Sequence, residues 1–211
     1  MAPSIEQLDI ADPADAWRNA GFAVDDDGVC RVGTVRLRLV GRNGGKRIVG
    51  WALRGVDAVD EIDGLATTTS AREPADPARH PNGVRVIDHL VVATPNLART
   101  VKALEAAGMD ARRTRDSDTY GAPMRQVFFR LGEVILEVIG DPEATGDGPA
   151  VFYGLAFTVA DLDETKAFFG DHLGTPKPAV QPGRRIATLR HKELDLSVAT
   201  ALMSSGDQEY A

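Results

Sequence analysis

One stretch of this chain, residues 86–97, constrains the fold more than any other. Residues 86–93 are largely apolar and rich in Val and Ile, which predicts a strand that is covered on both faces. Thr94 and Pro95 then predict a helix start, because a Thr side chain caps unpaired backbone N–H groups and Pro suits the first helical position. His89 lies in the middle of the strand among apolar neighbours, so its polar ring needs a structural or functional reason.

A second apolar strand, residues 132–140, contains a carboxylate, Glu137. Side chains alternate between the two faces of a strand, so one face of this strand is wholly apolar and is expected to lie under the helix. Glu137 points the other way. In the earlier strand the same alternation predicts that His89 shares a face with Ile87, while Asp88 points to the opposite face. His89 and Glu137 should therefore project from the helix-free side of one sheet.

The order of strand, helix and three strands, with His89 in the first strand and Glu137 in the last, resembles the vicinal oxygen chelate superfamily. This superfamily includes glyoxalase I, extradiol dioxygenases, fosfomycin-modifying enzymes and bleomycin-resistance proteins. The resemblance covers about residues 84–200. It implies an α+β fold in which repeated βαβββ units form a curved mixed sheet, a half-barrel with the site in its concavity. It also implies two metal ligands from each unit, at positions that His89 and Glu137 match.

Other parts of the chain repeat the unit in shortened or diverged form. Residues 4–41 read as a short first unit, and Ile48–Val56 reads as the opening strand of a fourth unit that is not completed. The predicted division is a degenerate unit plus an extra strand at 1–65, a linker rich in Pro, Thr and Ser at 66–83, a complete two-unit domain at 84–203 and a disordered polar tail at 204–211.

Alignment of the two units of the larger domain bears on the metal pattern. With the last strand predicted at residues 194–199, Gly154 takes the position of His89 and Ser197 that of Glu137. Glycine has no side chain and serine is a poor ligand, whereas a catalytic ion usually has three or four protein ligands. We therefore expect little or no bound metal, or a weakly bound divalent ion at His89 and Glu137. The sequence specifies no other cofactor.

The concave face should carry the residues that act on a ligand. Glu137 and His89 are the catalytic candidates, because a buried carboxylate without a partner costs on the order of several kcal/mol and so must be paired, protonated, solvated or bound to a cation. The predicted substrate-binding residues are Gln126, Phe128, Arg130, Phe152, Arg190 and Ser197. Arg130 or Arg190 would either neutralise Glu137 or hold an anionic substrate group, and the sequence leaves both open. His80 is expected to be a solvated residue of the linker.

Composition narrows the partners. The formal net charge of −7 argues against nucleic acid, because phosphate binding needs basic patches. Cys30 is the one cysteine of the chain, no apolar run approaches membrane-spanning length, and the first ten residues lack the pattern of a signal peptide. We expect a cytoplasmic protein with a small-molecule ligand. We also expect a homodimer, since incomplete units leave sheet edges to be covered.

Two functions stay open at this point. One is an enzyme that acts on a small oxygen-rich or carbonyl molecule by lyase or isomerase chemistry of the glyoxalase kind, with Glu137 as base, or by chemistry related to that of the dioxygenases. The other is a metal-free protein that binds or sequesters a small molecule, as drug-binding members of the superfamily do. Retention of His89 and Glu137 favours the first, and the missing ligands at Gly154 and Ser197 favour the second.

Overall fold

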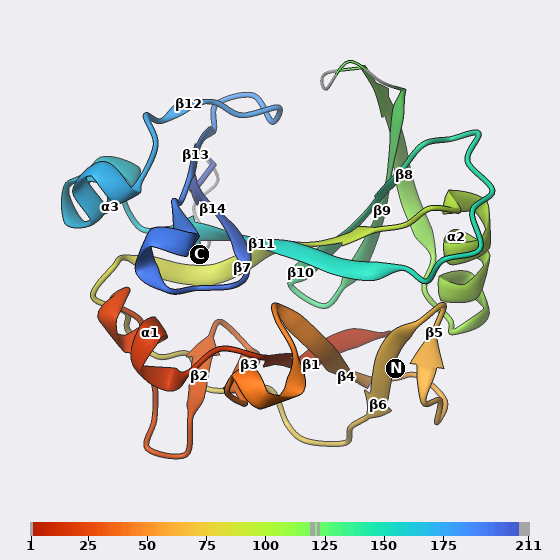
Figure 1. Cartoon of the computed structure of the whole chain (residues 1–211), viewed down its shortest axis with the longest axis horizontal. Coiled ribbons are helices and arrows are strands. Elements are labelled where there is room, and N and C mark those ends of the chain that lie inside the picture. Colours follow the sequence, from red (N-terminus) through yellow and green to blue (C-terminus); the bar gives the residue numbers. More distant parts are fainter. Residues whose placement is uncertain (1, 119–120, 122, 207–211) are drawn as a thin grey trace.

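A computed structural model describes residues 2–118, 121 and 123–206 as two stacked, curved sheets (Figure 1). The N-terminal sheet has six strands in the order β2-β3-β1-β4-β6-β5. They are β1 (Ser4–Ile10), β2 (Val29–Val32), β3 (Val35–Leu39), β4 (Ile48–Arg54), β5 (Glu61–Ile62) and β6 (Leu65–Thr69). The C-terminal sheet has eight strands in the order β12-β13-β14-β11-β7-β10-β9-β8. They are β7 (Val84–Ala93), β8 (Ala111–Ser117), β9 (Met124–Leu131), β10 (Val134–Gly140), β11 (Val151–Val159), β12 (Lys177–Pro178), β13 (Arg185–Thr188) and β14 (Ala199–Ser204).

The helices are short. They are the α-helices α1 (Ala14–Asn19), α2 (Leu97–Ala106) and α3 (Leu162–Phe169) and the 3₁₀ turns η1 (Arg42–Gly44), η2 (Gly170–His172) and η3 (His191–Leu194). Asn96 caps α2 by accepting a hydrogen bond from the Arg99 N–H at 3.1 Å, so the cap predicted at Thr94 lies two residues too early. Within the described residues, no helix is long and apolar enough to cross a membrane.

The C-terminal sheet consists of two βαβββ units. The first runs from β7 through α2 to β10, and the second from β11 through α3 to β14. Their first strands, β7 and β11, pair antiparallel at the centre of the sheet, and each first strand pairs parallel with the last strand of its own unit. The predicted α+β class, with a curved mixed sheet of repeated units, is confirmed. In Figure 1 the hollow of this sheet opens away from the N-terminal sheet.

The N-terminal sheet repeats this plan with parts missing. β1 and β4 pair antiparallel at its centre, as β7 and β11 do, and β1 pairs parallel with β3. Strand β4 is followed by β5 and β6, and Thr67–Thr69 in β6 pair with β4. The linker predicted at 66–83 therefore begins inside a strand. Threonine is β-branched and favours strands, although a run of polar residues is also typical of a loop.

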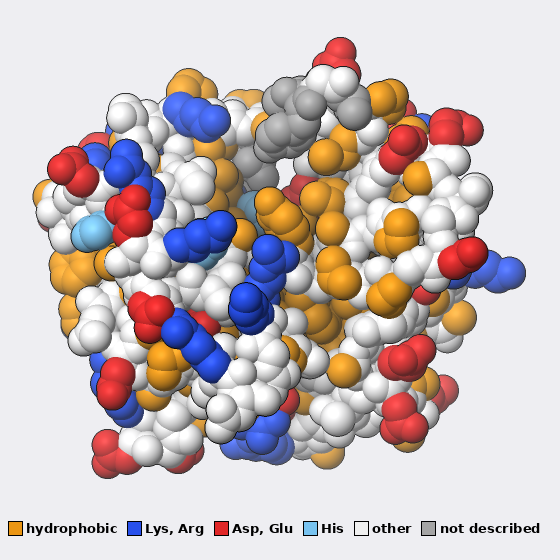
Figure 2. Space-filling view, in the orientation of Figure 1, with side chains coloured by type: hydrophobic (Ala, Val, Ile, Leu, Met, Phe, Trp, Pro, Cys, Tyr) orange, Lys and Arg blue, Asp and Glu red, His pale blue; other side chains and the backbone are white. Residues whose placement is uncertain are grey.

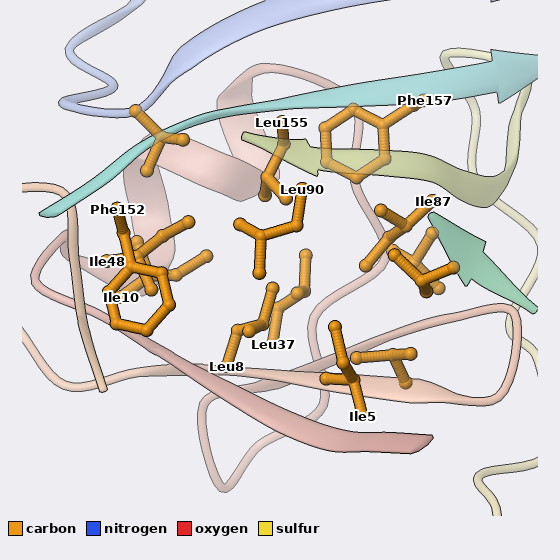
Figure 3. Packing of buried hydrophobic residues seen from close by; sticks show 14 of the residues in the cluster. Ile5, Leu8, Ile10, Leu37, Ile48, Ile87, Leu90, Phe152, Leu155 and Phe157 are labelled. Carbon is orange, nitrogen blue, oxygen red and sulfur yellow. The ribbon is translucent and has the colours of Figure 1, made fainter. Parts of the chain in front are cut away.

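The core lies between the two sheets. In Figure 3, Leu8 and Leu37 of the N-terminal sheet approach Leu90 and Leu155 of the C-terminal sheet, and all four belong to one buried cluster. The apolar face predicted for β10 is buried as expected, but the N-terminal sheet covers the convex side of the larger sheet together with α2.

The predicted last strand at residues 194–199 is wrong. Residues 191–194 form η3, and Asp195 follows in the left-handed conformation with φ 60° and ψ 22°. β14 therefore begins only at Ala199 and runs to Ser204, so the predicted disordered tail at 204–211 overlaps a strand by one residue. Residues 207–211 of that tail lie outside the described residues.

Candidate functional site

A β-bulge in β7 shapes the centre of the concave face. Ala156 of β11 pairs with His89, and the next residue, Phe157, pairs with Ile87, so Asp88 is the extra residue. A bulge lets two consecutive side chains point to the same face. Ile87 is buried in the core between the sheets, whereas Asp88 and His89 both make polar contacts on the concave face. The strict alternation predicted for this strand is wrong at this point.

His89 lies between two carboxylates. Its Nδ1 is 2.9 Å from Oδ1 of Asp88, and its Nε2 is 3.6 Å from Oε2 of Glu137 on the neighbouring strand β10. A carboxylate only accepts hydrogen bonds, so the contact with Asp88 requires a proton on Nδ1. The side chains of His89 and Glu137 are 17% and 12% exposed, so both atoms that face each other are largely removed from water. The structure thus brings together the two residues that the sequence singled out.

Asp88 is held in its charged form. Its Oδ2 accepts hydrogen bonds from Nη2 of Arg184 at 2.5 Å and from the hydroxyl of Thr158 at 3.0 Å. Burial alone would raise the pKa of Asp88, but the hydrogen bonds from His89 and Arg184 outweigh it and lower the pKa to about 2. Arg184 also donates to the backbone oxygen of Ser204, which ties the loop before β13 to β14.

Glu137 has a second partner, Gln126 of β9. The amide nitrogen of Gln126 donates to Oε1 of Glu137 at 2.5 Å. The amide oxygen of Gln126 is buried and, among the described residues, has no hydrogen-bond donor. Phe128 pairs with Glu137 across the sheet, and Arg130 pairs with Ile135, while the alternate residues of β9 are buried. Gln126, Phe128 and Arg130 therefore lie on the concave face as expected; their role in binding stays a prediction.

Three predicted binding residues lie elsewhere. Phe152 is buried against Trp51 of the N-terminal sheet, with ring centroids 5.3 Å apart. A second bulge causes this, because Tyr153 is the extra residue of β11 and shifts the faces before it. The hydroxyl of Ser197 accepts from the backbone N–H of Arg47 at 2.7 Å, at the junction with the N-terminal unit.

Arg190, the third of these residues, precedes η3, and its side chain is 59% exposed and 3.8 Å from Glu193. It therefore lies away from Glu137. His80, expected to be solvated, is buried: its Nδ1 accepts from the N–H of Ala23 at 3.0 Å and its ring packs against Phe22.

Comparison with known proteins rests on structure alone. No family model and no curated protein matches the sequence. A triple variant of 4-hydroxymandelate synthase from Streptomyces coelicolor matches with a TM-score of 0.66 at 14% identity, over 99% of this chain and 94% of that chain. Methylmalonyl-CoA epimerase from Streptomyces coelicolor, in complex with 2-nitronate-propionyl-CoA, matches with a TM-score of 0.47 at 22% identity, over 61% of this chain and 99% of that chain. Both neighbours are vicinal oxygen chelate proteins.

The chain has the vicinal oxygen chelate fold.

Among the described residues, the concave face does not present the four metal ligands that the resemblance implies. Superposition of the two units by strand register places His89 on Gly154 and therefore Val91 on Ala156. Glu137 pairs with Val91, and Ala201 pairs with Ala156, so Ala201 takes the position of Glu137. The residue predicted there, Ser197, is therefore four positions out of register. The correction leaves the donor count unchanged, because alanine offers no ligand.

Within the described residues, no group of three or more His, Cys, Asp or Glu side chains is arranged to hold an ion. Asp88, the third acidic or imidazole group near His89, is already engaged by Arg184 and Thr158. The donors present do not fit a resident catalytic ion, which usually needs three or four protein ligands. What the site does present is an imidazole and a carboxylate that face each other, with a second carboxylate bonded to Nδ1 of the imidazole.

Proposed function

We propose that this protein binds a small oxygen-rich or carbonyl molecule on the concave face and catalyses proton transfer on it, in lyase or isomerase chemistry of the glyoxalase kind. One observation carries the proposal. His89 and Glu137 face each other across 3.6 Å, beyond hydrogen-bond distance, while each is fixed from behind by another side chain. Such a gap suits a pair that exchanges a proton with a bound molecule.

Glu137 is the base in this scheme. Gln126 occupies Oε1, so Oε2 is the oxygen that faces His89 and the hollow. Oε2 would take a proton from a carbon next to a carbonyl group. The electron pair of that C–H bond would form a C=C bond, and the π pair of the carbonyl group would move to its oxygen. The proton would then return to the same carbon, or, in a 2-hydroxy ketone, to the former carbonyl carbon while the proton of the hydroxyl group moves to the enolate oxygen, so the step needs no oxidant or reductant.

His89 would position the reacting oxygen through Nε2 when both ring nitrogens carry a proton, since a neutral ring protonated at Nδ1 can only accept at Nε2. Asp88 holds the proton on Nδ1 and thereby fixes the ring, which leaves Nε2 directed at Glu137 and at a bound molecule. This use of a buried carboxylate to orient an imidazole is common in acid–base catalysis. Arg184 and Thr158 keep Asp88 charged, so they support the orientation without reaching the substrate.

The surroundings leave room for a ligand. Gly154, Ala156 and Ala201 lie on the concave side of the neighbouring strands β11 and β14 and are small. Figure 2 shows the molecule hollowed above the central strands, with apolar side chains gathered on the side of β8 and β9. A small molecule with an apolar part and a carbonyl group suits such a surface.

A second function is favoured by the same small residues. They provide no donor opposite His89 and Glu137, so the concave face would also serve a protein that binds or sequesters a molecule without reacting with it. The net charge of −7 speaks against nucleic acid as the ligand in either case.

Hydrogen–deuterium exchange distinguishes the two functions. The protein is incubated in D₂O with 2-hydroxy ketones, thiol adducts of 2-oxoaldehydes and 2-alkyl thioesters, and loss of the proton next to the carbonyl is followed by NMR. We expect exchange of at least one class, and a loss of about 100-fold or more in Glu137→Gln, since a general base contributes about 10²–10⁴-fold.

The matched control is Glu105→Gln, which removes a carboxylate on the exposed side of α2 and should leave exchange unchanged. Binding without exchange in the wild-type protein would establish the sequestering function instead. Exchange that persists in Glu137→Gln would refute the assignment of the base.

A further inference from the structure

A cavity of about 650 Å³ lies away from the concave face, where the turn between β9 and β10 meets the N-terminal sheet. The segment after β6 closes one side of it. Its lining combines the apolar residues Ile5, Val35, Pro74 and Leu131 with the charged residues Arg54, Arg72, Glu73 and Glu133. The volume falls in the range of about 300–1,000 Å³ that small-molecule sites occupy. The cavity shares no lining residue with the His89–Glu137 site, so it does not depend on the function proposed above.

Arg54, the last residue of β4, is the unusual member of this lining. It is only 8% exposed, yet its hydrogen bonds within the described residues all go to neutral oxygens. Nε donates to the hydroxyl of Ser4 at 3.1 Å, Nη1 to the backbone oxygen of Arg72 at 3.2 Å and Nη2 to that of Ile5 at 3.1 Å. One N–H on each terminal nitrogen is therefore left over, because a guanidinium group has five.

Two of the carboxylates near Arg54 are bonded to other groups, and a third, Glu73, is exposed at the edge of the cavity and forms no ion pair with Arg54. Glu6 pairs with Arg36 at 2.6 Å and lies 3.7 Å from Arg72. Glu133 accepts from the backbone N–H of Thr34 at 2.6 Å. No ion pair among the described residues includes Arg54. A buried charge is costly unless an opposite charge compensates it, and no described carboxylate makes direct contact with the Arg54 guanidinium group.

The position of Glu133 is fixed by the backbone. Gly33 precedes Thr34 with a φ of +56°, and a Cβ at that residue would lie 2.2 Å from Oε1 of Glu133. Glycine permits both the left-handed conformation and the close approach. Glu133 of the C-terminal sheet thus contacts the N-terminal sheet directly, and the cavity lies at the seam that joins the two sheets.

We propose that this cavity is a second ligand site, which binds a small monocarboxylate with an apolar body. The carboxylate would accept the remaining N–H groups of Nη1 and Nη2, a bidentate geometry that guanidinium groups favour. The apolar body would lie against Ile5, Val35 and Leu131. A carboxylate supplies the missing negative charge, and the aliphatic lining selects against a fully hydrated anion such as acetate.

Phenylacetate and isovalerate are suitable probes, with phenylacetamide and isovaleramide as neutral controls of the same shape. At ten times its Kd, a carboxylate that binds only the folded chain should raise Tm by about 3–6 °C, whereas the amides should not. In NMR spectra of the labelled protein, shifts should centre on Thr34, Val35 and Gly132. Shifts centred on His89 and Glu137, or no shifts with either carboxylate at 10 mM, would overturn the proposal.

Two variants test the contacts. Arg54→Lys keeps the charge but loses the fork, and should weaken carboxylate binding by about tenfold or more. Arg54 also bonds to three neighbours, so this variant risks misfolding. Ala71→Trp avoids that risk, because Ala71 is an exposed residue of the lining and a large ring there would fill the cavity. Ala71→Trp should abolish binding, and wild-type affinity in this variant would refute the site.

Discussion

Asp12 joins the N-terminal unit to the segment that precedes β14, and its removal should be costly. Its carboxylate is fully buried and accepts three hydrogen bonds. Nε1 of Trp17 donates to Oδ2 at 3.1 Å, and the backbone N–H of Ser197 donates to Oδ1 at 3.1 Å and to Oδ2 at 3.0 Å. Asp12 does not cap the neighbouring helix, because α1 begins after Pro13 without a side-chain cap.

The expected cost follows from these contacts. Asp12→Ala leaves two buried donors, on Trp17 and Ser197, without an acceptor, and each such donor costs about 1–3 kcal/mol. Removal of a buried charge offsets part of that sum. We expect a loss of about 2–4 kcal/mol in the free energy of unfolding, which for a chain of this size corresponds to a Tm lower by about 4–16 °C. Asp12→Asn keeps one acceptor oxygen and should cost less.

Urea unfolding followed by circular dichroism measures the loss. Asp15→Ala is the matched control, because the side chain of Asp15 is 86% exposed and its ion pair with Arg18 lies on the surface. That variant should stay within about 0.5 kcal/mol of the wild type. The amide of Ser197 should also exchange with solvent faster in Asp12→Ala. Equal stability of Asp12→Ala and Asp15→Ala, with unchanged exchange at Ser197, would refute the reasoning.

Three further predictions concern metal, pH and assembly. Protein purified without chelators should carry much less than one transition-metal ion per chain in elemental analysis; a near-stoichiometric ion on His89 and Glu137 would contradict this. Burial lowers the pKa of His80 below its ordinary 6.5, so protons favour the unfolded chain. Buried neutral His80 should make its full contribution to the free energy of unfolding above pH 6.5, and this contribution should be lost as the pH falls below that value. Urea titrations of His80→Gln should show a weaker pH dependence, and an unaltered one would exclude His80 as the cause. Sedimentation equilibrium should detect a homodimer. A monomer mass that does not change with concentration would contradict this prediction.

The sequence predicts residue faces well where a strand is regular. In β9, Val127 and Phe129 are buried while Gln126 and Phe128 face the hollow, as period-two alternation predicts. The pairing of His89 with Glu137 follows from the same rule applied to β7 and β10. A face predicted from period-two alternation is correct only while each residue of the strand pairs with one residue of the neighbouring strand.

The failures occur where that condition breaks down. The bulge at Asp88 turns a residue assigned to the opposite face into the partner of His89, and the bulge at Tyr153 places Phe152 in the core. Neither bulge leaves a mark in the hydrophobic pattern. Arg184 was missed for another reason: it comes from a loop and contacts Asp88 across 96 residues of sequence, a distance that no local pattern spans.

The N-terminal unit has the same bulge but lacks the histidine and glutamate that face each other in the C-terminal sheet. With Pro13 aligned to Pro95, Glu6 corresponds to Asp88 and Gln7 to His89, and β1 has a register shift between Ile5 and Gln7. Both units have a carboxylate at the bulge that forms an ion pair with an arginine. Glu6 pairs with Arg36 in the N-terminal unit, and Asp88 pairs with Arg184 in the C-terminal sheet.

The groups in front of that carboxylate differ between the two units. Gln7 stands at the position of His89, and its amide does not titrate. Arg38 stands at the position of Glu137, because it pairs with Asp9 in the strand register as Glu137 pairs with Val91. The first unit thus keeps the supporting ion pair without a base or an imidazole to support. The Glu6–Arg36 pair lies next to the amide of Gln7, which cannot transfer a proton, so its role is structural. The Asp88–Arg184 pair instead orients the ring of His89, which can accept and donate a proton. If proton transfer occurs on this chain, it therefore takes place in the unit that runs from β7 to β10.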